Sequence, residues 1–491
     1  MVQLGSVTDD LGSKAMTVMS VQGLDALEQR VSFDLACLNY PPPNWVVPTT
    51  HPGSIPVTDV VVIGAGMAGL VLTFSLLRNG IRNIRCLDRN PAGFEGPWAT
   101  YARMETLRSP KVLTGPAAGI PSLTCRAWFV AQFGHEAWEE LDKIPRLMWM
   151  DYLRWYRRIL ALPIENNVEV QRIRPLDNLL ALDLADDTTI LARKTVMATG
   201  REGLGQPHIP DFIHPIPRHF WAHTADDIDF AALRGKRVIV IGASASAMDN
   251  AAEALEHGCA ELRLLIRRDD LPRINKLTGI GSAGFTHGYR EATEAWQWRT
   301  MLYSEETGPP APRNSTLRVS RHPNAHFHLD SAIETIAAGA DHITVRTSRA
   351  KTFAADFIIL ATGFTVEAAS RPEIAAFANA IATWSDRYTP PPEFANAELG
   401  AYPYLGPHLQ FTEKHAGEAP FLANIHCFNH AASLSIGKVA GDIPAISTGA
   451  AWLANGIAAE LYNRDIEAHW QILQDFDKPE LFGDEWTDAE R

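Results

Sequence analysis

The chain has 491 residues, 46% of them hydrophobic, and a formal net charge of −13. This length and composition predict at least two globular domains with sizeable cores. A strongly acidic surface repels phosphate and anionic lipid, so we expect neither a nucleic-acid nor a membrane partner. The cysteines, at positions 37, 86, 125, 259 and 427, form no CxxC pair, which argues against a disulfide framework, a zinc site and a dithiol reductase and fits a reducing cytoplasm.

Residues 1–50 are expected to form an N-terminal extension. They begin without a basic segment that leads into an apolar stretch, so no secretory signal is expected. Apolar residues recur at helical spacing over residues 24–38, and three prolines follow Tyr40, which together predict one helix and its end. This helix either packs on the main body or contributes to a homodimer.

The next element combines a buried strand with a glycine-rich turn. Residues 60–77 carry no charge, but the apolar run ends in Gly64-x-Gly66-x-x-Gly69, which predicts strand, turn and helix rather than a membrane span. In a dinucleotide-binding unit, Gly64 allows the tight turn, Gly66 admits a pyrophosphate, and Gly69 lets helix and strand pack closely. The phosphates then lie at the helix N-terminus, where free N–H groups attract anions.

An acidic residue ends the following predicted strand, which covers residues 84–88. Asp88 stands where such units hydrogen-bond the adenosine ribose of a bound dinucleotide. The neighbouring Arg89 is assigned to the same site. Together with the glycine turn, this acid predicts an FAD-binding unit.

A second unit of the same kind follows later in the chain. An apolar strand leads into the turn Gly242-Ala-Ser244-Ala-Ser246-Ala, in which Ala replaces the last Gly, as this type of turn permits. The next predicted strand ends in Arg267 and Arg268 instead of an acid. Guanidinium groups at that position suit a 2′-phosphate and favour NADPH over NADH, unless they only face solvent.

Two strand ends carry the same Ala-Thr-Gly sequence. Thr199 and Gly200 end one strand, and Thr362 and Gly363 end another. Small residues there allow the chain to pass close to a bound cofactor and to change domain. The predicted fold class is α/β, with two Rossmann-like three-layer nucleotide-binding domains, the second inserted in the first. The expected division is an extension at 1–50, an FAD domain at 51–200, an NADPH domain at 201–355, and the second part of the FAD domain with a C-terminal helix at 356–491.

These motifs resemble those of the two-dinucleotide-binding flavoprotein monooxygenases, a group that includes flavin-containing monooxygenases, Baeyer–Villiger monooxygenases and microbial N-hydroxylases. The resemblance covers about residues 58–460. Asp356-x3-Leu-Ala-Thr-Gly-Phe is similar to a signature of the N-hydroxylating branch. The turn that ends in Trp98 is similar to the family's GG-x-W turn beside FAD, with one Gly missing. Residues 104–111 are similar to a flavin-lining stretch of N-hydroxylases, with the spacing shifted by one. The linker signature of several subfamilies is not intact around His223, which counts against the Baeyer–Villiger and mammalian types.

The resemblance implies an NADPH- and FAD-dependent monooxygenase. Such an enzyme oxygenates a small organic substrate with O2 through a flavin C4a-(hydro)peroxide, and N-hydroxylation is slightly favoured. Arg103, Arg108 and Lys111 lie in the loop expected near the flavin; they stabilise negative charge, bind a substrate carboxylate, or form surface ion pairs. Asn429 belongs to a polar cluster near the C-terminus and is the fourth catalytic candidate. Asp442 either contacts the ribityl chain of FAD or caps a helix.

Three other interpretations stay open at this point. An NAD(P)H-dependent flavin oxidoreductase or oxidase would insert no oxygen, and a Baeyer–Villiger enzyme would oxygenate a ketone. A redox-sensing or structural flavoprotein would bind nucleotide without turnover. The chain has no HExxH or GxSxG motif, so neither a metal site nor a nucleophilic triad is expected. The Trp-rich run at 147–156 forms core or lines a substrate pocket.

Overall fold

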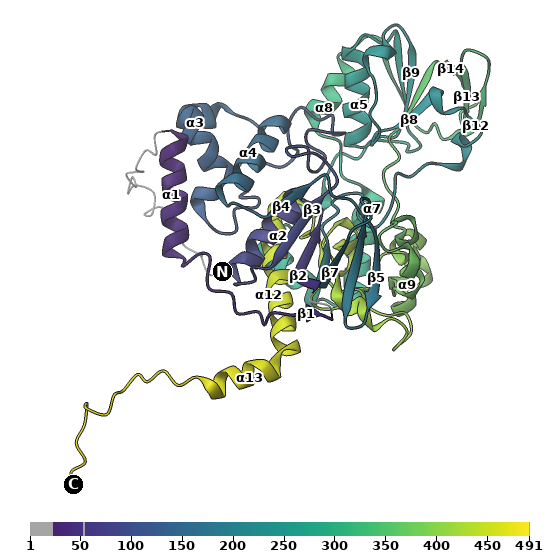
Figure 1. Ribbon diagram of the computed structural model, residues 1–491. Coiled ribbons are helices and arrows are strands. Elements are labelled where there is room, and N and C mark those ends of the chain that lie inside the picture. The colour runs from purple at the N-terminus through teal and green to yellow at the C-terminus, as the bar shows by residue number, and fades with distance from the viewer. Residues whose placement is uncertain (1–22, 53–54, 491) are drawn as a thin grey trace, which may run out of the picture.

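The computed structural model describes residues 23–52 and 55–490, and it confirms the predicted α/β class with parallel sheets and Rossmann-like units (Figure 1). Part of the expected extension at 1–50, including the start of the chain, lies outside the described residues. The two parallel sheets lie in separate lobes, and the second lobe stands at the upper right of Figure 1.

The first sheet has a parallel part and an antiparallel part that share one long strand. Its parallel strands are arranged in the order β4-β3-β2-β7-β16, and β5 and β6 form an antiparallel meander onto the first half of β7. A short strand, β1, pairs with β2. The strands are β1 (Thr50–His51), β2 (Ile55–Ile63), β3 (Ile84–Asp88), β4 (Ile164–Asn166), β5 (Val170–Leu176), β6 (Leu179–Leu184), β7 (Thr189–Met197) and β16 (Ile425–Cys427).

The second parallel sheet has the order β11-β10-β9-β15-β8. A separate antiparallel meander, β12-β13-β14, leads into β15. The expected boundary at 355/356 falls between β14 and β15, and the domain division stays a proposal. The strands are β8 (Trp221–His223), β9 (Arg237–Ile241), β10 (Glu261–Leu265), β11 (Ala325–His328), β12 (Ile333–Ala338), β13 (Ile343–Thr347), β14 (Thr352–Ala355) and β15 (Phe357–Leu360).

Helices cover both sheets. The helices that follow the glycine turns are α2 (Met67–Arg78) and α5 (Ala245–Glu256); α12 (Ile446–Arg464) packs on α2, and α8 (Arg313–Ser320) packs on α5. Ten residues of α2 are buried, because an apolar helix between sheet and α12 has no solvent face. The remaining α-helices are α1 (Leu24–Cys37), α3 (Cys125–Glu140), α4 (Arg146–Ile159), α6 (Ala283–Gly288), α7 (Glu294–Thr307), α9 (Trp384–Arg387), α10 (Ala397–Gly400), α11 (Ser433–Ile436) and α13 (Ile466–Asp475).

Two predictions about helices are settled by burial. Leu27, Val31 and Leu35 of α1 are buried against the region of α3, so this helix packs on the main body as expected. The Trp-rich run forms α4, in which Trp149 and Tyr152 are fully buried, so the run is core. Residues 60–77 form strand, turn and helix, and no helix in the described part of the chain has the length and apolar character needed to cross a membrane.

Two crossing segments join the lobes and pair with each other. One follows β7, and the other follows β15. The N–H of Thr365 donates to the carbonyl of Gln206 at 2.9 Å, that of His208 to Gly363 at 2.8 Å, and that of Glu367 to Leu204 at 2.7 Å. The two connections therefore form a short antiparallel ribbon.

Candidate functional site

The first glycine turn leaves no room for a side chain at Gly64 or Gly69. Gly64 has φ of +100°, and a Cβ placed there would lie 2.5 Å from the carbonyl oxygen of Ala198. A Cβ on Gly69 would lie 1.9 Å from the carbonyl oxygen of Gly64. Gly66 precedes α2 and faces the turn at Gly96, whose Cα would be 3.6 Å from a Cβ on Gly66. Strand, turn and helix thus approach as closely as a phosphate-binding turn requires.

Asp88 is fixed directly against this turn. Its carboxylate accepts hydrogen bonds from the N–H of Ala65 and from the N–H of Asn90, both at 2.8 Å. Burial raises the pKa of the Asp88 carboxyl, and the two backbone hydrogen bonds oppose that rise. The carboxylate retains unused lone pairs for a ribose hydroxyl, as expected for this position. The expected neighbour Arg89 extends to Glu202 at 3.5 Å, so it pairs with a residue that follows β7.

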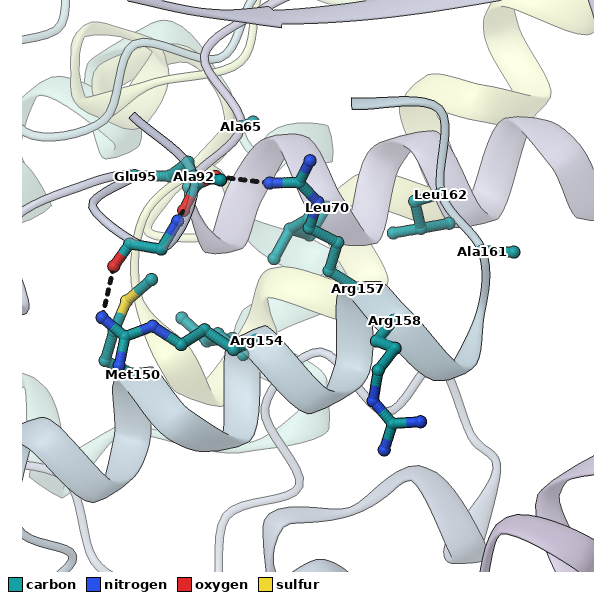
Figure 2. A pocket seen from close by; sticks show the side chains of 13 residues that line it. Ala65, Leu70, Ala92, Glu95, Met150, Arg154, Arg157, Arg158, Ala161 and Leu162 are labelled. Atoms are coloured by element: carbon teal, nitrogen blue, oxygen red, sulfur yellow. Dashed lines mark hydrogen bonds and ion pairs between the residues drawn. The ribbon is translucent and has the colours of Figure 1, made fainter. Parts of the chain in front are cut away.

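A cavity of about 480 Å³ lies between the glycine turn and α4 (Figure 2). Figure 2 shows Glu95 at one end, bound by the guanidinium of Arg157 at 2.6 Å, while Arg154 donates to the carbonyl of Gly93. Arg157 also donates to Asn166, so its cation is held in place by two partners. Anchored arginines beside a bare glycine turn fit the adenosine diphosphate part of a dinucleotide.

Trp98 packs against α4. Its ring lies edge-on to the buried Trp149, with 6.4 Å between centroids, and its carbonyl accepts from Arg146. The structure thus gives Trp98 a packing role, from which contact with FAD stays a prediction.

The second glycine turn is more open. A Cβ on Gly242 would lie 2.6 Å from the carbonyl oxygen of Ala361, so the tight turn is retained. Ser244 precedes α5 without capping it, and both Ser244 and Ser246 are exposed. Arg267 is exposed and has no hydrogen bond or ion pair within the described residues. Arg268 differs, because its guanidinium donates to the carbonyl of Glu306 at 2.9 Å. Only Arg267 thus has its guanidinium available for a 2′-phosphate.

The Ala-Thr-Gly ends hold the chain crossings. Thr199 donates to the carbonyl of Gly203 at 2.9 Å, and Thr362 donates to the carbonyl of His208. Gly200 and Gly363 have φ of +70° and +81°, which residues with a Cβ rarely adopt. These four residues shape the strand ends at which both expected cofactors would lie.

Asn429 has a positioning role that differs from the expected catalytic one. Its side chain is fully buried and donates to the carbonyl of Met197 at 3.2 Å and to the hydroxyl of Thr199 at 3.1 Å. Its amide oxygen accepts from the N–H of Ala431 at 3.0 Å. With every polar atom used, Asn429 fastens the ends of β7 and β16 together rather than facing a substrate.

The three basic residues of the loop separate in space. The ammonium of Lys111 donates to the carbonyl of Trp138 and, at 3.1 Å, to that of Glu139, so it binds the end of α3. Arg103 donates to the carbonyl of Thr100 at 2.6 Å and lies over the ring of Phe230 in the second lobe. These contacts favour structural roles for Arg103 and Lys111 over charge stabilisation at the flavin or binding of a substrate carboxylate.

Arg108, by contrast, belongs to a group of charges that the sequence did not bring together. We call this group the charged cluster; it consists of Arg108, Arg201, Glu305, Lys438 and Asp442. Burial lowers the pKa of the Arg108 guanidinium, with Asp442 opposing and Arg201 reinforcing the effect. Burial likewise lowers the pKa of the Lys438 ammonium, with the other four members all close enough to act on it.

Glu305 is the acid of the cluster whose titration is displaced most. Its side chain is partly exposed to solvent. The protein groups packed around it still desolvate the carboxyl, which raises its pKa to about 7. Glu398 reinforces the rise, whereas Lys438, the Tyr402 hydroxyl and Arg201 oppose it. Such a carboxyl changes its charge near neutral pH, as acid–base groups of active sites do.

Sequence patterns carried only part of this information. Arg201 directly follows the Ala-Thr-Gly end of β7, so its position next to a cofactor-facing strand end was available in principle. Lys438 follows Gly437, which has φ of +74°. Glu305 lies at the end of α7 and had no local signal. Within residues 23–52 and 55–490, no three metal-ligating side chains come together.

Comparisons with known proteins agree with this architecture. A family model described as pyridine nucleotide-disulphide oxidoreductase matches residues 61–277, which include both glycine turns. The ornithine hydroxylase of Pseudomonas aeruginosa superimposes with a TM-score of 0.64 at 15% identity, covering 82% of this chain and 100% of that one. The L-lysine 6-monooxygenase of Pseudomonas syringae has a TM-score of 0.62 at 16% identity, covering 83% and 99%. At 15% and 16% identity, these two structures show that the fold is shared.

A curated relative defines the family more narrowly. The FAD-dependent urate hydroxylase of Xanthomonas campestris pv. campestris is 38% identical over 463 residues, which are 94% of this chain and 98% of that protein. The protein is therefore a flavin-dependent monooxygenase with FAD as its cofactor. The chain belongs to the family of this hydroxylase.

Proposed function

We propose that the protein hydroxylates urate, or a closely related small heterocycle, with FAD, NADPH and O2. The observation that carries the proposal is the 38% identity to a urate hydroxylase over 94% of this chain. The glycine turns, Asp88 and Arg267 support the cofactor part, because each stands where a dinucleotide of that kind needs it. NADPH and the substrate are inferred, whereas the flavin-dependent hydroxylase class follows from the family.

The residues described above divide the work of binding. The N-terminus of α2 and the turn from Gly64 to Gly69 would hold the FAD pyrophosphate, and Asp88 would hold the adenosine ribose. The N-terminus of α5 with Ser244 and Ser246 would hold the NADPH pyrophosphate, and Arg267 the 2′-phosphate. When bound, FAD supplies the redox chemistry, taking electrons from the nicotinamide and transferring one oxygen atom of O2 to the substrate.

N-hydroxylation, which the Asp356 signature and the basic loop slightly favour, gains no support from the contacts of Asp356. Asp356 pairs with the guanidinium of Arg237 and accepts from the N–H of the same residue at 2.8 Å. Both residues stand at the starts of β9 and β15, whereas the cofactor-binding turns follow the strand ends. Asp356 thus secures the sheet, and oxygenation of a carbon atom in a ring takes first place.

Oxygen transfer to urate is tested with purified protein, NADPH and isotopically labelled O2. We expect urate to accelerate NADPH consumption and one labelled oxygen atom to enter the product, as seen by mass spectrometry. Ornithine and lysine serve as the amine comparison. Labelled oxygen in an amine product would identify an N-hydroxylase, and hydrogen peroxide without any oxygenated product would identify an oxidase.

A further inference from the structure

The charged cluster lies at the edge of the first sheet where the parallel strands end. Arg201 follows β7 and His430 follows β16, and these strands run parallel, so both residues emerge at one edge. A hydrogen bond of 3.1 Å from the N–H of His430 to the carbonyl of Gly200 holds the two ends together. In open α/β sheets, ligands bind beyond this edge.

The remaining members reach the same place from other segments. Lys438 follows α11, Asp442 precedes α12, and Glu305 ends α7. An aromatic core that contains Tyr289, Trp298 and Tyr402 joins α7 to the C-terminal segment and so positions Glu305. The hydroxyl of Tyr289 donates to the carbonyl of Leu434 at 3.0 Å, which fixes α11 directly before Lys438.

The cations of this cluster are not neutralised by ion pairs. Within the described residues, Arg108, Arg201 and Lys438 have no carboxylate within the 4.0 Å of a salt bridge. Arg157, which binds Glu95 at 2.6 Å, is an example of a cation that is paired. Three cations face only two acids, Asp442 and Glu305, of which Glu305 loses its charge near neutral pH. Lys438 is half-buried, whereas Arg108 and Arg201 are exposed, so the three positive groups remain available to an anion that binds among them.

We propose that the charged cluster binds the substrate as an anion, with Arg201 as the central contact and Arg108 and Lys438 beside it. Arg201 has this place because it directly follows Gly200, whose carbonyl accepts from the N–H of His430 where β7 and β16 end side by side. The proposal rests on the proposed function, since urate is a planar heterocycle that carries one negative charge at neutral pH. A cationic amine such as ornithine would be repelled by the same three groups.

Glu305 makes the strength of this site depend on pH. The groups that face it are Glu398, Lys438, Tyr402 and Arg201. Because its pKa is raised to about 7, Glu305 is neutral below that pH and negative above it. The cluster is thus most positive below pH 7. The affinity for an anion falls as the pH rises through 7, and Glu305→Gln removes this dependence.

The test uses isothermal titration calorimetry on the FAD-loaded protein. Urate and orotate are the anionic probes, uracil is the neutral counterpart of orotate, and ornithine is the cation. We expect Arg201→Gln to weaken the binding of both anions by on the order of tenfold or more, because a hydrogen bond to a charged group contributes that much. Lys438→Gln should have a smaller effect of the same sign. Arg349→Gln, at an exposed turn in the second lobe, is the control.

Each outcome has one meaning. Unchanged FAD content and flavin absorbance in Arg201→Gln show that the variant is folded. Anion affinities that survive both Arg201→Gln and Lys438→Gln overturn the anion site, even if the protein hydroxylates urate. Binding of orotate that depends on Arg201, without any turnover of urate, supports the anion site and overturns the proposed substrate. Ornithine bound more tightly than either anion overturns the proposal outright.

Discussion

The two nucleotide-binding units have the same topology, but their glycine turns differ in how tightly they are enclosed. In the first unit, the carboxylate of Asp88 accepts a hydrogen bond from the turn, and the turn at Gly96 faces Gly66. In the second unit, Ser244 replaces Gly66 and Ala247 replaces Gly69. No carboxylate among residues 23–52 and 55–490 accepts a hydrogen bond from this turn. An enclosed turn suits a resident cofactor, and an open one suits a co-substrate that exchanges in every cycle. The degree of enclosure, rather than the fold, therefore distinguishes the two sites.

The two sheets have the same arrangement of strands, but their outermost strands come from different points along the chain. In each unit three parallel strands are followed by an antiparallel meander and a return strand beside the first strand. In the first unit the meander continues into the sheet as one strand, β7, whereas Asp356 separates β14 from β15 in the second. The outermost strand comes late in the chain for the first sheet, as β16, and early for the second, as β8.

The largest expected effect is that of Gly69→Ala. The added Cβ would meet the carbonyl oxygen of Gly64 at 1.9 Å, and backbone on both sides prevents relief. We expect a loss of FAD and destabilisation by about 3 kcal/mol. Flavin content and thermal unfolding measure both. The matched variant Ala247→Gly removes a Cβ that the second unit accommodates, and it should cost only about 1 kcal/mol. Equal losses in the two variants would show that the turns are equally close.

Asp88→Ala should strongly weaken the binding of FAD but leave the protein folded. The change removes the acceptor for two backbone N–H groups and the expected ribose partner, at a cost of about 2 kcal/mol in FAD affinity. Fluorescence titration of FAD into the apoprotein measures it. Asp88→Asn keeps one acceptor oxygen, so its FAD affinity should lie between that of the unsubstituted protein and that of Asp88→Ala. An FAD affinity that is unchanged in Asp88→Ala would contradict the assignment of the first turn to FAD.

Arg267→Gln should separate the two nicotinamide cofactors. The substitution removes the exposed guanidinium expected to bind the 2′-phosphate. This should raise the KM for NADPH on the order of tenfold and leave the KM for NADH nearly unchanged. Arg268→Gln should have the smaller effect, because that guanidinium already binds the carbonyl of Glu306. Steady-state kinetics with both cofactors decides the matter. Equal changes for NADPH and NADH would remove Arg267 from the 2′-phosphate site.

The smallest expected effect concerns a buried acid of α5. Asp249 occupies the place that Val71 has in α2, and burial raises its pKa to about 6. Because the pKa is raised in the folded state, folding favours the protonated form of Asp249. Its contribution to the free energy of unfolding is therefore present at low pH and is lost as the pH rises through 6. Asp249→Asn should therefore stabilise the protein by about 1 kcal/mol more at pH 8 than at pH 5. Denaturant unfolding at both pH values measures it; identical increments would show that Asp249 ionises without cost.

Local patterns predicted the turns well, and they failed where function depends on long-range contacts. Gly64, Gly69 and Asp88 could be placed because strand, turn and helix are contiguous in sequence. The sequence predicts catalytic roles for Lys111, from its basic loop expected near the flavin, and for Asn429, from its polar cluster near the C-terminus. Their partners, the carbonyls of Trp138 and Met197, lie too far along the chain to be seen. Arg201, Lys438 and Glu305 meet only after the C-terminal segment folds back onto the first sheet, so no spacing rule could have joined them.

The ribbon formed by the two crossing segments determines how the lobes can move. Two separate linkers would let one lobe tilt in any direction over the other. Here the backbone hydrogen bonds of Thr365, His208 and Glu367 join the connections side by side, and a paired ribbon bends poorly in its own plane but twists readily. We therefore expect motion between the lobes to be a torsion about the ribbon axis. Such a swivel would turn the nicotinamide unit across the flavin unit while the distance between the two stays nearly constant.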